Sequence, residues 1–255
     1  AKRGAPILVQ FDDILGVIAA AYVSEKGVDP RSIAIVKNFV EKLGHKKVTF
    51  KSDQERAIIA LREEVKRHTW VEIIDEKSKA YDSQSNGPAE NSVQLFEKQF
   101  RTLRDSLETR LGSRLSSCHP FISYLVEHAA KTINRYRVGQ DGKTGYRRWK
   151  GKDFKVEIPE IGEKVFYLPR KIDIVDKSLP RWSYGIFVGV TDDSNEMQIA
   201  VQGDIKLVRD VRRLVRMCDR WDRSYFDDNV TKNTWEHGGP EKHFVEDELM
   251  TAIPE

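Results

Sequence analysis

Apolar residues in the first half of the chain alternate between short continuous runs and helical spacing. The runs at 7–11 and 17–23 are separated by a short link, which predicts an antiparallel hairpin of two strands. Asp29 as N-cap and Pro30 at the first helical position predict a helix that ends at Gly44. The pattern then predicts a strand over 47–53, a helix over about 55–67 and a strand over 70–74.

The clearest amphipathic segment follows a loop at 83–88. From Val93 to Leu111 the apolar residues recur at i, i+3, i+4 and i+7 and form one stripe along a helix, which Gly112 ends. A further helix is expected over about 119–136.

The second half of the chain has a different pattern. Glycine and basic residues dominate residues 138–155, and short strand candidates separated by turn signals follow, which predicts a small barrel or curled sheet. After Trp221 the chain is polar with few apolar anchors, so a disordered tail or linker is expected. The predicted organisation is an α/β domain at 1–138, a basic linker at 139–160, a small β-rich module at 161–216 and a disordered polar tail at 217–255.

Composition narrows the class of protein only slightly. The net charge is +3 although charged residues make up 33% of the 255, so the distribution of charge matters more than its sum. The longest apolar run, 17–23, is too short to span a bilayer, and no signal peptide is evident, so no membrane partner is expected. Cys118 and Cys218 are too few for a disulfide framework or a Cys-based zinc site. A reducing compartment, the nucleus or the cytoplasm, is the expected location.

Two acidic residues stand where phosphoryl-transfer chemistry needs them. Asp53 ends a predicted strand, and Glu90 lies in the first turn of the strong helix. Carboxylates at a strand end and on a neighbouring helix bind two Mg²⁺ or Mn²⁺ ions that activate the attacking oxygen and stabilise the leaving one. The plainer alternative is that Asp53 starts a turn and Glu90 favours a helix N-terminus through the dipole, and spacing alone favours this alternative.

The residues that flank the two acids favour the metal-binding interpretation over the plainer one. FKSD at 50–53 and SQSNGPAE at 83–90 resemble the integrase core of retrotransposons and retroviruses, where an aspartate follows Thr or Ser at a strand end and the catalytic glutamate stands in P-Q-(S/T)-N-G-x-x-E. This chain has Ser83 where proline is usual. Weaker similarities to copia-like and related elements are found in LVQFDD at 8–13, GKTGYRRW at 142–149 and WSYGIFVG at 182–189.

The resemblance implies a ribonuclease H-like integrase core, a mixed sheet with flanking helices, followed by a small β-rich module. It implies two-metal DNA strand transfer, with Asp53 and Glu90 as two of three ligands of Mg²⁺ or Mn²⁺. The implied partners are the DNA of the element ends and of the target, and the intact protein would be a homo-oligomer.

The chain departs from the family at its beginning. The first catalytic aspartate would lie on a strand before Ala1, because Asp12 and Asp13 match the second strand of the family, and the upstream zinc module is absent. The resemblance therefore implies a retroelement polyprotein fragment that begins inside the core and is inactive as truncated. Whether the chain is an enzyme is left open.

Basic and amide side chains supply candidate DNA contacts. The resemblance places one set along substrate DNA: Asn86, Gln94, Arg101 and Arg104. A dense basic stretch adds phosphate-binding candidates: Lys131, Arg135, Arg137, Lys143, Arg147, Arg148 and Lys150, repeated more weakly by Arg209, Arg212, Arg213 and Arg216. A solvated helix face and a solvated linker explain the same residues equally well. The alternative functions are a non-enzymatic DNA-binding remnant or scaffold derived from a retroelement, and another ribonuclease H-like nuclease.

Overall fold

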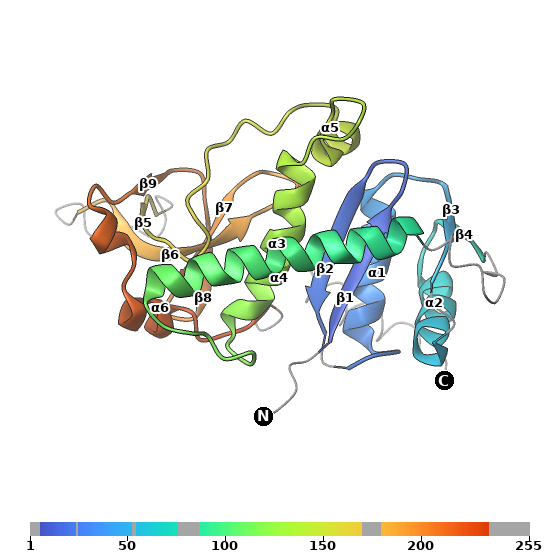
Figure 1. Cartoon of the computed structure of the whole chain (residues 1–255), viewed down its shortest axis with the longest axis horizontal. Helices are drawn as coiled ribbons and strands as arrows, with labels where there is room; N and C mark the ends of the chain where they lie inside the picture. Colours follow the sequence, from blue (N-terminus) through green and yellow to red (C-terminus); the bar gives the residue numbers. More distant parts are fainter. Residues whose placement is uncertain (1–5, 24, 53–54, 76–86, 170–179, 235–255) are drawn as a thin grey trace. The chain divides into compact units, whose positions relative to one another are not determined.

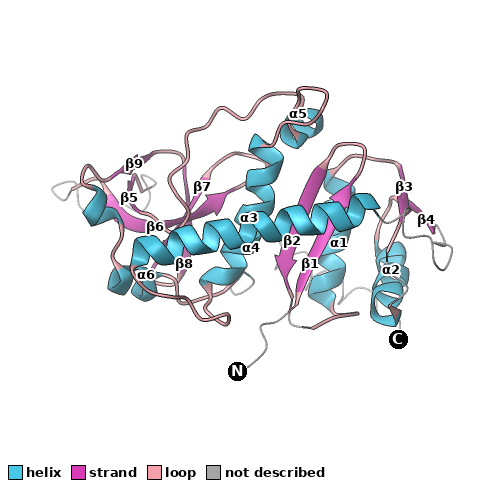
Figure 2. Ribbon diagram, viewed as in Figure 1, coloured by secondary structure: helices cyan, strands magenta, loops and turns pink. Residues whose placement is uncertain are grey.

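The computed structural model describes residues 6–23, 25–52, 55–75, 87–169 and 180–234. The chain divides into two compact units, of which unit 1 contains Ala1–Lys98, Ala130–Asp153 and Gly238–Glu255, and unit 2 contains Gln99–Ala129 and Phe154–His237. Figure 1 follows the chain through both units, and Figure 2 distinguishes helices from strands. The mixed α/β fold class, with a small β-rich module in the second half of the chain, is confirmed.

Unit 1 begins with the predicted hairpin of β1 (Ile7–Asp12) and β2 (Val17–Tyr22), which pair antiparallel with Ile7 opposite Tyr22. Gly16 allows the tight turn because its φ is +65°, a conformation that residues with a Cβ seldom adopt. The Asp12 carboxylate accepts a hydrogen bond from Leu15 N at 2.7 Å, which closes the turn.

The other two strands in the described part of unit 1 form a parallel pair. These strands are β3 (Lys47–Phe50) and β4 (Glu72–Asp75). Helix α2 (Arg56–His68) provides the crossover between them, and α1 (Pro30–Lys42) precedes β3. Asp29 caps α1 as predicted and accepts from the backbone N–H groups of Arg31 and Ser32. Apolar residues of α1 and α2, with Val71 just before β4, form a cluster against which both strand pairs pack. Its buried members are Val36, Val40, Leu61, Val65 and Val71, and Leu8, Val48, Phe50 and Ile73 lie against them.

Three further helices follow β4 along the chain: α3 (Gly87–Leu111), α4 (Phe121–Tyr136) and α5 (Gly145–Lys150). The first part of α3 and the last part of α4 belong to unit 1, and their other parts belong to unit 2. In unit 1 the buried amide of Asn134 on α4 bonds both backbone groups of Ile18 on β2, at 2.8 and 2.7 Å. This two-point contact fixes the end of α4 against the hairpin.

Unit 2 contains a five-stranded antiparallel sheet in the order β8-β7-β6-β5-β9. Its strands are β5 (Lys164–Tyr167), β6 (Ser183–Val190), β7 (Met197–Val201), β8 (Asp204–Val208) and β9 (Val211–Arg213). Phe187 and Ile199 are fully buried in it. The β-rich module that the turn signals predict is therefore present.

The prediction of a disordered tail from residue 217 is wrong for the part that the structure describes. A short 3-10 helix, η2 (Met217–Arg220), and α6 (Arg223–Asn229) follow the sheet. Phe226 of α6 is completely buried and packs on Phe121, with ring centroids 4.8 Å apart. One aromatic side chain in a deep contact therefore orders a segment whose composition is polar.

The predicted domain boundaries also differ from the two units. Residues 139–153, predicted as linker, belong to unit 1, and residues 99–129, predicted as core, belong to unit 2. The first of these segments folds because Val138 forms a β-bridge with Thr144 and because Thr144 caps α5. In the described part of the chain, no helix is long and apolar enough to cross a membrane.

Candidate functional site

Glu90 occupies the first turn of α3, as the motif predicts, and its side chain is exposed. No hydrogen bond or ion pair joins its carboxylate to any residue in the described ranges. The carboxylate therefore faces water rather than the interior. Asp53 and Asn86 lie outside the described residues, so the separation of the two predicted metal ligands stays a prediction.

The candidate metal site has the right kind of ligand but an incomplete set among the described residues. No group of three or more His, Cys, Asp or Glu side chains in those ranges is arranged to hold a metal ion. An exposed carboxylate such as that of Glu90 supplies the hard oxygen that Mg²⁺ and Mn²⁺ prefer, so the chemistry of this donor fits. Asp12 is held elsewhere, because its carboxylate accepts from Leu15 N and lies 3.0 Å from His45 Nε2.

A pocket of about 550 Å³ lies in unit 1 beside the first turns of α3. Four elements line it: α3 between Pro88 and Lys98, the β1–β2 hairpin, the end of α4 with the loop that follows, and α5. Gln94 and Arg148 are the two predicted DNA-contacting residues that the pocket brings together. Arg137 of the predicted basic stretch also lines the pocket, together with Lys98, which sequence reasoning did not select. The signal for Lys98 was its spacing, since Glu90, Gln94 and Lys98 follow at four-residue intervals on one helix.

Arg148 is used internally rather than offered to a ligand. Its guanidinium donates to the Asp141 carboxylate through Nε at 3.0 Å and through Nη2, and to Leu15 O at 3.1 Å and Lys143 O at 3.3 Å. The hydrogen bond from Arg148 lowers the pKa of Asp141 to about 2, and the same contact raises the pKa of Arg148. Arg148 therefore joins the loop after α4 to the hairpin turn.

Two glycines make room for this guanidinium. A Cβ on Gly16 would stand 2.9 Å from Arg148 Nη1, and a Cβ on Gly139 would stand 2.3 Å from Nη2. Gly145 is equally close-packed, since its Cβ would meet Gly16 O at 2.6 Å. The absence of side chains at these positions brings the hairpin turn, the loop and α5 into direct contact.

The other predicted phosphate-binding residues around α5 are more accessible. Lys143 and Arg147 are exposed, and Arg147 Nη1 lies 3.4 Å from the Asp153 carboxylate. Lys150 Nζ lies 4.0 Å from the centre of the Trp149 ring, and Trp149 Nε1 donates to Lys42 O at 2.9 Å. An exposed ion pair such as Arg147–Asp153 is weak, so this arginine remains available to phosphates.

The remaining two candidates, Arg101 and Arg104, lie on the part of α3 that belongs to unit 2. Arg101 is exposed, whereas Arg104 donates to Glu108 at 2.9 Å and to Leu115 O at 2.6 Å. Burial raises the pKa of Glu108, but the hydrogen bonds from Arg104 and Leu115 N outweigh it and the net pKa is lowered. Arg104 thus holds the end of α3 to the loop that follows it.

No protein-family model matches the sequence, and no curated protein matches it. Solved structures that resemble the chain include the catalytic core domain of BIV integrase, at 18% identity and a TM-score of 0.39, covering 57% of this chain and 85% of that one. Another is the simian T-cell lymphotropic virus intasome in complex with PP2A regulatory subunit B56 gamma, at 13% identity and a TM-score of 0.36, covering 82% of this chain and 75% of that one. Likeness at this level assigns neither residues nor an activity to this chain.

Proposed function

We propose that this chain carries two of the three carboxylate ligands, Asp53 and Glu90, with which an integrase-type polynucleotidyl transferase binds Mg²⁺ or Mn²⁺ to join a DNA 3′ end to a second DNA. One observation carries the proposal. The SQSNGPAE motif leads into a helix whose first turn presents Glu90 exposed and without a partner among the described residues. An exposed carboxylate with no partner in the described ranges is accessible to a divalent ion, whose hard-oxygen preference it meets.

The chemistry needs no covalent enzyme intermediate. The 3′ hydroxyl oxygen of one DNA forms a bond to phosphorus in the other, the existing P–O3′ bond breaks, and the departing oxygen takes a proton. Bound divalent ions supply the counter-charge for the attacking and leaving oxygens. Glu90 and Asp53 would fix that charge, and the chain's further contribution would be to position the DNA.

The basic residues around α5, of which Lys143 and Arg147 are exposed, support the DNA partner. Lys143, Arg147 and Lys150 follow one another along a short segment, and the Trp149 ring adds an aromatic group beside Lys150. Each phosphate contact releases condensed counterions, so such a surface gives affinity that depends on salt and not on base sequence. The same observation favours the second candidate function, DNA binding without catalysis.

Metal binding and end joining test the proposal together. Mn²⁺ binding, measured by the water-proton relaxation rate, should weaken in Glu90→Gln, whereas Glu97→Gln is the control because Glu97 is an exposed acid on the same helix. When the chain is extended by a strand that supplies the third carboxylate, it should join a short labelled duplex with Mn²⁺, and Glu90→Gln or Asp53→Asn in that extended chain should abolish the joining. If Glu90→Gln binds Mn²⁺ as wild type does, the metal-ligand assignment is wrong and binding without catalysis becomes the better description.

A further inference from the structure

The pocket in unit 1 has an apolar floor that the proposed chemistry does not use. Ile18 and Ile133, which are 3% and 7% exposed, form it together with Phe11 and Leu95. Val138 extends the apolar surface to the rim, where it is 60% exposed. A volume of about 550 Å³ lies within the range of pockets that hold small ligands or a few side chains.

The rim of the same pocket is cationic. Lys98, Arg137 and Arg148 line it, and no carboxylate is among the lining residues that the structure describes. Arg148 is balanced by Asp141. The exposed side chain of Arg137, in contrast, has no hydrogen bond or ion pair with any residue that the structure describes. Arg137 therefore carries an uncompensated charge at the mouth of an apolar cavity.

We propose that this pocket binds a peptide segment of a partner protein in which an apolar side chain stands next to an aspartate or glutamate. The apolar side chain enters between Ile18 and Ile133. The neighbouring carboxylate pairs with the guanidinium of Arg137, whose planar fork matches a carboxylate with two parallel hydrogen bonds. The proposal does not depend on metal binding at Glu90.

The lining favours a peptide over a nucleic acid. Among the described lining residues Phe11 is the only aromatic one, so this part of the pocket offers little of the stacking surface on which bases bind. Lys143 and Arg147, the exposed cations beside α5, do not line it, and Arg148, which does, is already paired with Asp141. An apolar floor of aliphatic side chains with one free guanidinium at its edge matches an acidic and apolar peptide in both shape and charge.

The pocket is also already formed in the free chain. Arg148 holds the loop that carries Val138 and Gly139 to the hairpin turn, and Asn134 holds the end of α4 to β2. The loop and the helix end that line the pocket therefore need little further ordering when a peptide binds, which lowers the entropic cost of binding.

Fluorescence anisotropy of a dye-labelled acetyl-Asp-Leu-Glu-Leu-Asp-amide, added to the full chain, tests the proposal. We expect saturable binding, weakened about 10-fold or more in Arg137→Ala because a charge-assisted contact is lost. Arg56→Ala is the matched control, since Arg56 is an exposed arginine of unit 1 outside the pocket. A peptide with Asn and Gln in place of its acids should bind as weakly as Arg137→Ala binds the original.

A second variant separates the floor from the charge. Val138→Ser should weaken the peptide several-fold while leaving the urea midpoint unchanged, because Val138 is already exposed. Absence of saturable binding up to about 1 mM peptide overturns the proposal. Equal affinity in wild type, Arg137→Ala and Val138→Ser also overturns it. If Arg137→Ala weakens a short DNA duplex and leaves the peptide unaffected, the pocket belongs to nucleic acid instead.

Discussion

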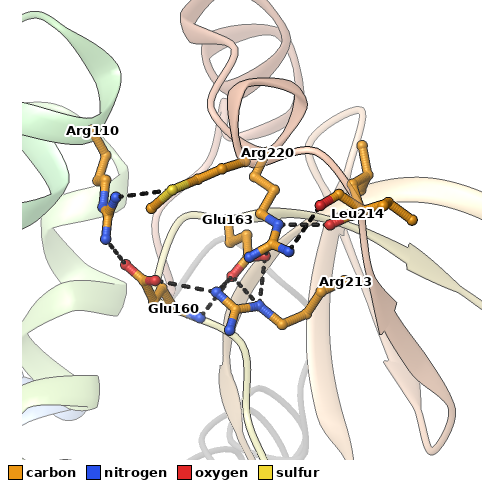
Figure 3. A network of polar contacts seen from close by, with 8 residues as sticks. Arg110, Glu160, Glu163, Arg213, Leu214 and Arg220 are labelled. Atoms are coloured by element: carbon orange, nitrogen blue, oxygen red, sulfur yellow. Dashed lines mark hydrogen bonds and ion pairs between the residues drawn. The ribbon is translucent and has the colours of Figure 1, made fainter.

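Replacing Glu163 should destabilise unit 2 far more than replacing its neighbour Glu160. Glu163 is completely buried just before β5, and Figure 3 shows its carboxylate between two arginines. Arg213 Nε lies 2.8 and 3.0 Å from its two oxygens, and Arg220 Nε lies 3.5 Å from Oε1. A backbone donor, Glu160 N, completes the set at 3.0 Å. The carboxylate thus joins the start of β5 to β9 and η2.

The size of the effect follows from what the substitution leaves behind. Removing one partner of a buried ion pair costs about 3–5 kcal/mol, because the remaining charge stays buried and unpaired. Arg213 and Arg220 have side chains 42% and 20% exposed, so water compensates them in part. We therefore expect Glu163→Ala to lower the free energy of unfolding by about 3 kcal/mol, the lower end of that range.

Glu160→Ala is the control because it removes a carboxylate from the same network at the surface. The Glu160 side chain is 40% exposed and pairs with Arg213 at 3.1 Å and Arg110 at 3.4 Å. Exposed pairs contribute about 0–1 kcal/mol, so this variant should unfold close to wild type. At a urea m-value of about 2 kcal/mol/M, the Glu163→Ala midpoint should fall by about 1.5 M.

Hydrogen exchange read by mass spectrometry assigns the loss to the right elements. Protection of β5 and β9 should fall about 100-fold in Glu163→Ala, since each 1.4 kcal/mol corresponds to a factor of ten. Protection of the β1–β2 hairpin in unit 1 should not change. If Glu163→Ala and Glu160→Ala shift the urea midpoint equally, the buried carboxylate does not stabilise this unit as argued.

Three further outcomes follow from individual contacts. Arg148→Ala should raise amide exchange in residues 139–144, because the bonds that fix this loop to the hairpin turn are lost; unchanged exchange would contradict this. Burial lowers the pKa of His119 below 6.5, so the folded state favours the neutral imidazole ring. The neutral ring therefore contributes its full stabilisation above pH 6.5, and this stabilisation is lost as the pH falls through the lowered pKa. The urea midpoint should therefore fall below pH 6.5 in wild type and less so in His119→Gln, and equal pH profiles would refute the assignment. Alanine at both Lys143 and Arg147 should reduce the log–log salt slope of DNA binding by about 0.9 per lost phosphate contact, measured by anisotropy across salt concentrations; an unchanged slope would remove them from the interface.

Local signals predicted the elements of unit 1 well because those elements depend on neighbours in sequence. Asp29 and Pro30 specify the start of α1 by capping geometry, whichever residues α1 later packs against. The hairpin of β1 and β2 needs only two apolar runs and a turn that Gly16 permits. Helical periodicity does not specify the exposed position of Glu90, because at about 100° per residue this position lies roughly 90° from the centre of the apolar stripe of α3.

Long-range contacts explain what the pattern did not predict. The segment after Trp221 is polar, yet Phe226 and Val230 are both buried, and four-residue spacing of two apolar side chains is too weak a signal to predict a helix alone. Phe226 packs on Phe121, more than a hundred positions earlier in the chain. The division into units depends on such contacts too, so a boundary placed where composition changes misses it.

Adjacent basic residues illustrate why charge density does not by itself locate a binding surface. Arg147 and Arg148 are adjacent in the sequence, but consecutive residues of a helix point in directions about 100° apart. In α5 this difference directs Arg147 to solvent and Arg148 to the hairpin turn. Arg147 points outward with a weak partner, whereas Arg148 is consumed by Asp141, Leu15 O and Lys143 O. Gly16 and Gly139, more than a hundred positions apart, leave the space that the Arg148 guanidinium occupies. The affinity of this stretch for phosphates should therefore come from Lys143, Arg147 and Lys150, and substituting Arg148 should act through the shape of the loop rather than through its charge.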